Sequence, residues 1–503
     1  MSQSFTRAQV EATRSDDSKQ KLIIIDSVVY DITKVRVSLL PLISLRCVGG
    51  ELLLLEYAGK DATEQFYNLH RHEVLVRYAR LAIGQIESET PKLETDFAAF
   101  SNVPFAEHPS VVTYSKSPYY TDEHRAYRKV VREFVNKHVL PDALECEDSG
   151  SRPSKQLNKL MAAEGYLTAR LGPGRHLKMM NGRLPGNLSA DKYDYFHEQI
   201  THEEFCRVMC RGYADGCGGG MIIGLPPVVN FAKKHVREKV VPEVLNGDKY
   251  AALAISEAFA GSDVAGLATR AEKTPDGKFF IVNGYIRSSN IYLGTKKWIT
   301  GGMYADYFST AVRTSKGISM LLIERSEGVS TKRIKTSYSP TAGTAYITFE
   351  NVKVPVENLL GIEDKGFMVV MSNFNHERWA MCVGVNRATR YVIEECFKWA
   401  NQRKVFGKKL LAQPVIRQKL AEMVSLNEAM TQWVDHLTYQ MNNHTYMEQA
   451  TVLAGPLALL KYQCTRVAHL VADQAVQIFG GRGITKTGMG RVIEGFHRGH
   501  KFE

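Results

Sequence analysis

The spacing of apolar residues changes twice along this chain of 503 residues, and that change limits the folds open to it. Residues 121–245 show helical spacing, with Thr121 and the acids after it as a helix start. From about Tyr250 to Pro355 the pattern alternates, and from about Lys365 it is helical again. Since one core rarely serves so long a chain, we predict a helical domain at 118–249, a β-domain of roughly six to eight short strands at 250–358 and a helical domain at 359–503.

A smaller unit precedes these three domains. LIIIDSVVYDIT predicts two short strands around a turn, and YAGKDATEQFYNLHRHEVLVRYARLAIGQI predicts helix, helix, strand, which together give an α+β unit at 22–86. Residues 87–117 carry several prolines and no sustained period, and we interpret them as a linker. The run GCGGGMIIGLPPVVNFA at 216–232 lacks the lysine and the strand of a phosphate-binding loop, so we interpret it as a flexible bend between helices.

The composition of the chain limits the class of protein to which it can belong and the partners that it can bind. Apolar residues make up 44% and charged residues 23%, which is ordinary for a soluble globular chain. The net charge of +11 suits an anionic cofactor, a coenzyme A ester or nucleic acid. A solvated basic surface is the commoner explanation of such a charge, and no basic run interleaved with aromatics indicates nucleic acid. Eight cysteines without a CxxC pair predict reduced, buried thiols rather than disulfides or zinc.

Targeting signals are also informative. The polar stretch MSQSFTRAQVEATRSDDSKQ is no secretory signal, and the apolar run at 37–55 is too interrupted to span a bilayer. The terminal KFE is not a peroxisomal tripeptide of the SKL kind. We therefore expect an intracellular protein that is not secreted, either peroxisomal or cytosolic.

The stretch 371–407, MSNFNHERWAMCVGVNRATRYVIEECFKWANQRKVFG, carries an apolar face at helical spacing. Its members are Trp379, Cys382, Val385, Ala388, Val392, Cys396 and Trp399. We expect Glu377 to open this helix. An acid in a first turn is favoured by the helix dipole, and the alternative is a carboxylate that takes a proton inside a ligand cavity.

Four strings in this order resemble the acyl-CoA dehydrogenase family: ISEAFAGSDVAG, KKWITGG, QRKVFGKKL and VQIFGGRGITK. The resemblance covers residues 118–495 and implies helical, barrel-like β and helical domains that bind FAD and an acyl-CoA. By this resemblance one group of residues holds the flavin ring: Ile255, Ser256, Trp298, Ile299 and Thr300. Ser262 matches a position that contacts the acyl-CoA.

A second group matches positions that hold the FAD pyrophosphate and adenosine across a subunit boundary: Arg403, Phe406, Gln477, Gly480 and Gly481. The resemblance therefore implies a homo-oligomer, a dimer or a tetramer. In most of the family the catalytic glutamate lies in a YEG string near the C-terminus, but isovaleryl- and long-chain-type members carry it in strings like LERL. HERWAM matches the second type, so we assign the base to Glu377, although ungapped counting would bring Glu503 near the other position.

The chain departs from the family pattern in two places, an insertion at 285–293 (YIRSSNIYL) and the absence of the closing C-terminal helix. Either departure would weaken flavin binding or activity. The last domain is thus a truncated version of the family's.

The strings VVYDITK, YAGKDATEQF and LAIGQI resemble a cytochrome b5 domain, which clamps heme between two histidines. The second ligand matches His70, with His72 as the alternative. Where the family has HPGG this chain has Cys47, Val48, Gly49 and Gly50. Because heme b needs imidazole on both faces of the iron, we expect weak or absent heme in a degenerate unit.

The function implied is FAD-dependent α,β-dehydrogenation of an acyl-CoA thioester with Glu377 as base. A flavin oxidase of the nitroalkane oxidase type is the first alternative, and a non-catalytic flavoprotein that binds nucleic acid is the second. The fusion resembles fungal proteins encoded in secondary-metabolite and toxin clusters, which suggests tailoring of a fatty-acyl or polyketide chain. No motif identifies the electron acceptor.

Overall fold

The computed structural model describes residues 3–15, 18–33, 56–70, 74–75, 78–89, 97–112, 116–284 and 295–502. These fall into two compact units. The first unit contains residues 1–96, 398–417 and 475–494, and the second contains the remaining residues. The insertion at 285–293, the segment Cys47–Gly50, His72 and Glu503 lie outside the described residues.

The N-terminal part of the first unit is a four-stranded sheet in the order β1-β4-β3-β2. Its strands are β1 (Gln3–Phe5), β2 (Leu22–Ile25), β3 (Val28–Asp31) and β4 (Ala82–Ile86). The predicted pair of strands around a turn is confirmed, because β2 and β3 pair antiparallel through Asp26 and Ser27, both at positive φ. Helix α1 (Arg7–Glu11) and helix α5 (Thr63–Leu69) belong to the same part.

Strand β2 is buried on both faces, as its unbroken apolar run requires. Ile23 and Ile25 join one apolar cluster, whereas Leu22 and Ile24 join another with Val10 of α1. Residues 3–15, for which the sequence predicts no structural element, therefore form part of this core, and β1 extends the sheet parallel to β4.

The other part of the first unit brings together two segments far apart in sequence. The hairpin of β15 (Lys404–Val405) and β16 (Lys408–Lys409) follows the end of helix α17 (Gly366–Gln402). The ring of Trp399, in the last turn of α17, stacks on Phe479 with the ring centroids 5.3 Å apart. Phe479 ends helix α20 (Ala454–Phe479), so this stack joins the hairpin to the end of α20.

The second unit begins with helices, as the sequence predicts. The longer ones are α7 (Asp122–Phe134), α8 (Leu140–Ser149), α9 (Lys155–Ala163), α12 (Tyr195–Cys206) and α16 (Lys234–Leu245). Thr121 caps α7 as predicted, and its hydroxyl accepts a hydrogen bond from the backbone N–H of His124. Residues 97–112, expected as linker, pack here, because the buried Glu107 pairs with Arg132 of α7 at 2.6 Å.

The glycine-rich run is not the flexible bend that we expected. Residues 215–224 are helical, as a wide π-type turn (Asp215–Gly219) and the short α14 (Gly220–Gly224), and α15 (Pro226–Phe231) follows. Gly218 interrupts the helix with φ 158°, and its neighbours Gly216 and Gly220 fit closely against other backbone. Close tertiary packing thus overrides the low helix propensity of glycine.

The β-domain holds nine strands among the described residues, slightly more than predicted. They are β5 (Ala251–Ala254), β6 (Arg270–Lys273), β7 (Phe279–Asn283), β8 (Lys296–Ile299), β9 (Tyr307–Arg313), β10 (Ile318–Glu324), β11 (Val329–Arg333), β12 (Ala345–Phe349) and β13 (Val352–Pro355). One sheet runs β13-β7-β6-β9-β10-β14, with β5 beside β9 and β14 at Leu359–Leu360, and the other runs β11-β12-β8. In the part of the chain that the structure describes, neither sheet closes into the barrel that we expected.

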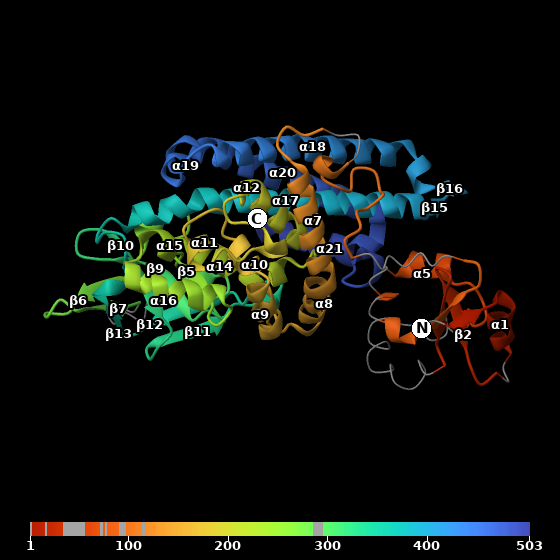
Figure 1. The fold of residues 1–503 in the computed structure, drawn as a ribbon, viewed down its shortest axis with the longest axis horizontal. Coiled ribbons are helices and arrows are strands. Elements are labelled where there is room, and N and C mark those ends of the chain that lie inside the picture. The colour runs from red at the N-terminus through yellow and green to blue at the C-terminus, as the bar shows by residue number, and fades with distance from the viewer. Residues whose placement is uncertain are drawn as a thin grey trace. The chain divides into compact units, whose positions relative to one another are not determined.

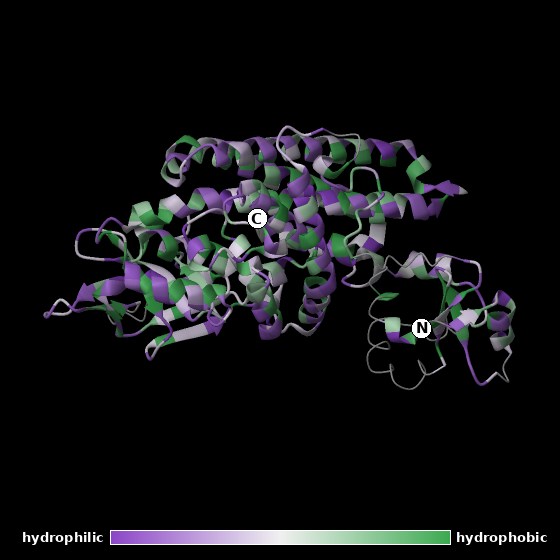
Figure 2. Ribbon diagram, in the orientation of Figure 1, coloured by the Kyte–Doolittle hydropathy of each residue, from purple (hydrophilic) through white to green (hydrophobic). Residues whose placement is uncertain are grey.

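Three long helices complete the second unit. Helices α17 and α18 (Pro414–Asn442) run side by side with α20 (Figure 1), and Trp379 Nε1 of α17 donates to Thr438 Oγ1 of α18 at 2.8 Å. Apolar and polar residues alternate along these helices (Figure 2), which fits helices with one buried and one exposed face. The predicted apolar face of α17 is buried except for the partly exposed Ala388. No helix in the described ranges combines the length and apolarity needed to cross a bilayer.

Candidate active site

Glu377 does not open its helix, contrary to the expectation from sequence. Helix α17 begins at Gly366, so Glu377 lies about three turns further on. The helix dipole acts within the first turn and cannot explain an acid at this position. The Oε2 atom of Glu377 is buried and has no hydrogen-bond partner. Burial raises the pKa of this carboxyl, and Lys461, Arg378 and His376 only partly oppose the effect.

A buried ionic cluster lies beside Glu377. His376 Nε2 is 2.7 Å from Glu198 Oε1, and His202 Nε2 is 3.2 Å from the same oxygen. Burial would lower the pKa of His376, but Glu198 reverses the direction and raises it. Glu198 and His202 lie one turn apart on α12, so α12 positions the cluster against α17. The aromatic wall around it is Tyr195, His202 and Trp379.

The glycine-rich helical segment connects Glu377 to the β-domain. The Nδ2 of Asn373, about one turn before Glu377, donates to the carbonyl oxygen of Ile223 at 2.9 Å. A side chain at Gly220 would approach the carbonyl oxygen of Thr300 to 3.2 Å. Glu377 and the predicted flavin-ring residues therefore flank the same short segment.

The flavin-ring residues themselves lie directly after β5 and in and after β8, and a buried ion pair holds these two segments together. Lys296 Nζ, at the start of β8, donates to Ile255 O at 2.9 Å and to Glu257 Oε1 at 2.8 Å. The backbone N–H of Lys297 donates to Ser256 O at 2.8 Å. Burial lowers the pKa of Lys296 to about 8, although Glu257 opposes the shift. The structure thus brings Ile255 and Ser256 next to the KKWIT strand.

Trp298 is held in an unusual conformation. Its backbone has φ 66°, rare for a bulky residue, and the residue is 54% exposed. Ile299 on one side is buried and Thr300 is partly buried. A strained backbone that presents a large aromatic ring to solvent indicates a binding surface rather than a core position.

The second predicted group lies in the first unit. Phe406 and Gly407, both at positive φ, form the two-residue turn of the β15–β16 hairpin, and Phe406 is 94% exposed at its tip. Gln477, Gly480 and Gly481 follow in and after the last turn of α20, where the Trp399–Phe479 stack places them near Arg403. An added Cβ at Gly480 or Gly481 would meet nothing within 4 Å. These residues offer an accessible surface with an exposed aromatic ring and a guanidinium.

Two further predicted residues take simpler positions. Ser262 is exposed in the connection between β5 and β6. His70 is the C-cap of α5, and its ring lies against Phe66 with a centroid distance of 5.2 Å. Burial lowers the pKa of His70, which favours the neutral form that a metal ligand needs. No histidine precedes His70 in the sequence, so the described unit lacks the first axial ligand of the b5 type.

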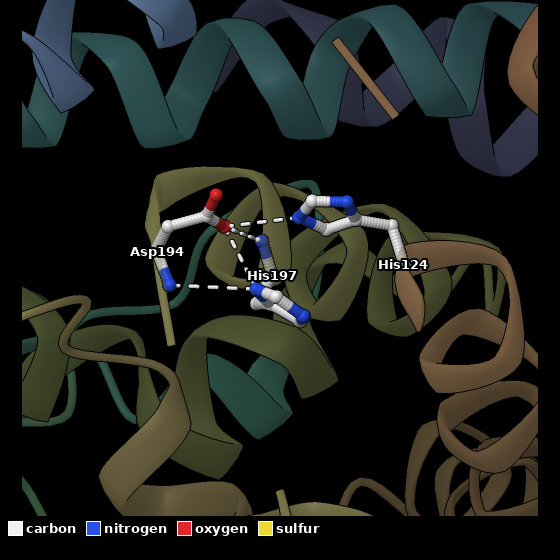
Figure 3. A group of neighbouring side chains, drawn as sticks. All are labelled: His124, Asp194 and His197. Carbon is white, nitrogen blue, oxygen red and sulfur yellow. Dashed lines mark hydrogen bonds and ion pairs between the residues drawn. The ribbon is translucent and has the colours of Figure 1, made fainter. Parts of the chain in front are cut away.

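One group of side chains has the spacing of metal ligands: His124, Asp194 and His197 (Figure 3). Asp194 Oδ1 lies 3.2 Å from His124 Nε2 and 2.7 Å from His197 Nδ1. Asp194 is the N-cap of α12, and His197 and His124 are the third residues of α12 and α7 in two capping boxes. The positive ends of two helix dipoles meet here, which favours the carboxylate and opposes a cation. We interpret the group as a shared helix cap.

Several residues of the site were missed at the sequence level. Glu198, His202 and His376 carry no local motif, and Glu198 is 178 positions from His376. Glu257 and Lys296 stood inside the quoted strings ISEAFAGSDVAG and KKWITGG. Because their charges are opposite and their two strings were predicted to bind one ligand, an ion pair between Glu257 and Lys296 could have been predicted from the sequence.

The fold and this arrangement define an acyl-CoA dehydrogenase. The family's N-terminal, middle and C-terminal domains match residues 121–248, 252–352 and 364–503, and a cytochrome b5-like heme/steroid binding domain matches residues 6–87. The chain belongs to the acyl-CoA dehydrogenase family and is an FAD-dependent oxidoreductase of that family. The predicted architecture is confirmed.

Similar proteins agree with this assignment. The chain is 37% identical to the acyl-CoA dehydrogenase apdG of Emericella nidulans, over 80% of this chain and 91% of the relative. It is 36% identical to the acyl-CoA dehydrogenase AFT10-1 of Alternaria alternata, over 79% and 91%. Among solved structures, a probable acyl-CoA dehydrogenase from Mycobacterium abscessus superposes with a TM-score of 0.66 at 26% identity, covering 76% of this chain and 94% of that one.

The described residues fit the FAD that the family binds. The exposed Trp298 indole provides a flat apolar wall, and the backbone of Ile255–Ser256 beside it carries polar groups for the pyrimidine edge. Arg403 supplies a guanidinium suited to a diphosphate. The heme of the b5-like domain fits less well, because only one of its two axial ligands has a counterpart here.

Proposed function

We propose that this enzyme introduces a trans double bond between the α- and β-carbons of an acyl-CoA thioester, with Glu377 as the catalytic base. The observation that carries the proposal is the unpartnered, buried Oε2 of Glu377 in the middle of α17. A carboxylate with a raised pKa is a stronger base than one in water, which suits removal of a weakly acidic α-proton.

The reaction balances with one base and one hydride acceptor. Glu377 takes the α-proton, the electron pair of that bond forms the new carbon–carbon double bond, and a hydride leaves the β-carbon. FAD, when bound, supplies the acceptor for that hydride. Ile255, Ser256, Trp298, Ile299 and Thr300 hold the flavin ring, and Ser262 contacts the acyl-CoA.

We also propose that Arg403, Phe406, Gln477, Gly480 and Gly481 bind the FAD pyrophosphate and adenosine of a partner subunit, which makes the enzyme a homo-oligomer. Their exposure in the first unit supports this role. The likeness to apdG and AFT10-1 supports a place in fungal secondary metabolism, acting on a fatty-acyl or polyketide chain.

The test compares flavin reduction in wild type and Glu377→Gln. Under anaerobic conditions, one of a panel of acyl-CoA esters should bleach the visible flavin band of the wild type. The variant should bind FAD equally but react about 10²–10⁴ times more slowly. Glu422→Gln, an exposed acid on α18, is the matched control and should react at the wild-type rate.

Two outcomes would contradict the proposal. A Glu377→Gln protein with full FAD and an unchanged bleaching rate would remove Glu377 as the base. Rapid reoxidation of the wild-type flavin by oxygen during turnover, without another acceptor, would favour a flavin oxidase instead.

A further inference from the structure

Arg170 differs from every other buried arginine in the described part of the chain. Arg128, Arg132, Arg387 and Arg390 are fully buried, and each pairs with a carboxylate. Arg170 is only 3% exposed and has no carboxylate partner. Its Nε has no hydrogen-bond partner at all. Burying an unpaired guanidinium is costly, so such a group marks a site where function compensates for lost stability.

The groups around Arg170 do not neutralise it. Its Nη1 donates to Cys217 O at 3.3 Å, and its guanidinium lies 4.9 Å from the centre of the Phe205 ring. Burial lowers the pKa of His202 and raises the pKa of Cys217, so both are uncharged neighbours. Glu198 is already engaged by His376 and His202. Asp215 is the remaining acid nearby. Burial raises its pKa and the charges of Arg211 and Arg170 oppose that rise, but its ion pair, at 3.5 Å, is with Arg211.

Arg170 lies against the same glycine-rich segment that links Glu377 to the β-domain. A Cβ at Gly218 would fall 2.4 Å from Arg170 Nη1, whereas a Cβ at Gly220 would point to Thr300. At Gly219 the three nearest atoms to an added Cβ all belong to its own turn. The segment therefore carries no side chain at Gly218, Gly219 and Gly220 beside Arg170. The buried side chains of Met221 and Ile222 follow, and then Ile223, whose carbonyl oxygen accepts a hydrogen bond from Asn373.

We propose that Arg170 binds a carboxylate at the far end of the acyl group, so that the preferred substrate is the mono-CoA ester of a dicarboxylic acid. This inference rests on the proposed function, because the acyl chain must extend from Glu377 along residues 218–223. A guanidinium makes paired, charge-assisted hydrogen bonds with a carboxylate. Arg170 has Nε free for such a pair, and a bound carboxylate would supply the missing counter-charge.

The experiment compares matched esters of equal chain length, hexanoyl-CoA with adipoyl-CoA and octanoyl-CoA with suberyl-CoA. We expect wild type to show a higher kcat/KM for the carboxylate-ended ester of at least one pair by about 10-fold or more. Arg170→Met, close in volume but uncharged, should lose about 10- to 100-fold on that ester and change little on its methyl-ended partner. Arg175 is an exposed arginine five residues further along the chain. Arg175→Met is the control and should keep the wild-type ratio of kcat/KM between the two esters of a pair.

Each other result has a defined meaning. The inference is overturned if wild type prefers the methyl-ended ester at both chain lengths. It is also overturned if Arg170→Met keeps the wild-type ratio of kcat/KM between the carboxylate-ended and methyl-ended esters. If Arg170→Met does not fold, the preference of wild type and the same kcat/KM ratio measured for Arg170→Lys test the inference instead. If no ester of either kind bleaches a fully bound flavin, the proposed function itself fails, which is distinguishable from a wrong preference.

Discussion

His376 precedes the proposed base in the chain and influences its charge. Burial would lower the pKa of His376, but Glu198 raises it above its ordinary value, which favours the protonated imidazole. Burial raises the pKa of Glu377, and the charges of Lys461, Arg378 and His376 lower it. The base acts in its ionised form, so kcat should rise as pH increases through the raised pKa.

Replacing His376 should therefore shift this pH profile. In His376→Gln one charge that favours the carboxylate is lost, the pKa of Glu377 rises further, and the inflection of kcat moves to higher pH. The plateau at high pH should fall by less than about tenfold, since the base itself remains. His235→Gln, which removes an exposed histidine paired with Glu357, is the control and should leave the profile in place.

A purely structural role for His376 predicts another result. The plateau would then fall at all pH values, and the inflection would stay where it is in wild type. That outcome would show that His376 holds α17 against α12 but does not influence the charge of Glu377.

At the scale of elements, α7 and α12 are joined through buried ion pairs. Arg132 contacts Glu107 at 2.6 Å and Glu204 at 2.8 Å, and all three are buried. Arg132→Met would remove one arginine partner from each of two buried acids, leaving Glu107 with Arg387 and Glu204 with Arg128, which should cost about 3–5 kcal/mol of unfolding free energy. Thermal unfolding followed by circular dichroism measures the loss. Arg125→Met on the same helix removes a solvent-accessible pair with Asp122 and a hydrogen bond from Arg125 Nε to Ser110 O, and should destabilise the protein by clearly less, about 1 kcal/mol.

The same ion pairs make the free energy of unfolding depend on pH. Although burial alone would raise it, Arg387 and Arg132 lower the pKa of Glu107 to about 2 from an ordinary 4.5. The folded state is the one with the lowered value, so this stabilisation is complete above pH 4.5 and is lost as the pH falls towards 2. An Arg132→Met protein as stable as wild type at neutral pH would contradict this account.

What the sequence could predict followed from local pattern. The apolar face from Trp379 to Trp399, the Thr121 cap and the β2–β3 hairpin each depend on residues a few positions apart, and each is confirmed. The start of α17 at Gly366 carries no cap signal, so Glu377 was placed at a helix end that it does not occupy. Residues 215–224 are helical because their glycines fit against neighbouring backbone, and the pairing of His376 with Glu198 is equally non-local.

The whole chain joins a b5-like unit to a flavoenzyme, and the two parts differ in how complete their sites are. The flavin-ring residues lie at the end of β5 and in and after β8, whereas both histidines of the b5-like unit, His70 and His72, match only the position of the second heme ligand. No histidine precedes His70. Low-spin heme b needs an imidazole on each face of the iron, so we expect a unit without a histidine at the first ligand position to bind heme weakly or not at all.

We therefore predict that the purified protein, expressed with added heme precursor, shows flavin absorbance but no stoichiometric b-type Soret band, as measured by a pyridine hemochrome assay. Cys47→His supplies an imidazole where the b5 loop has its first ligand, and since Gly49 and Gly50 follow at the matching positions, this variant should gain heme. His70→Ala in the Cys47→His background should lose it again. Stoichiometric heme in wild type would show that a ligand other than histidine completes the site, and the b5-like unit would then be an electron carrier rather than a remnant.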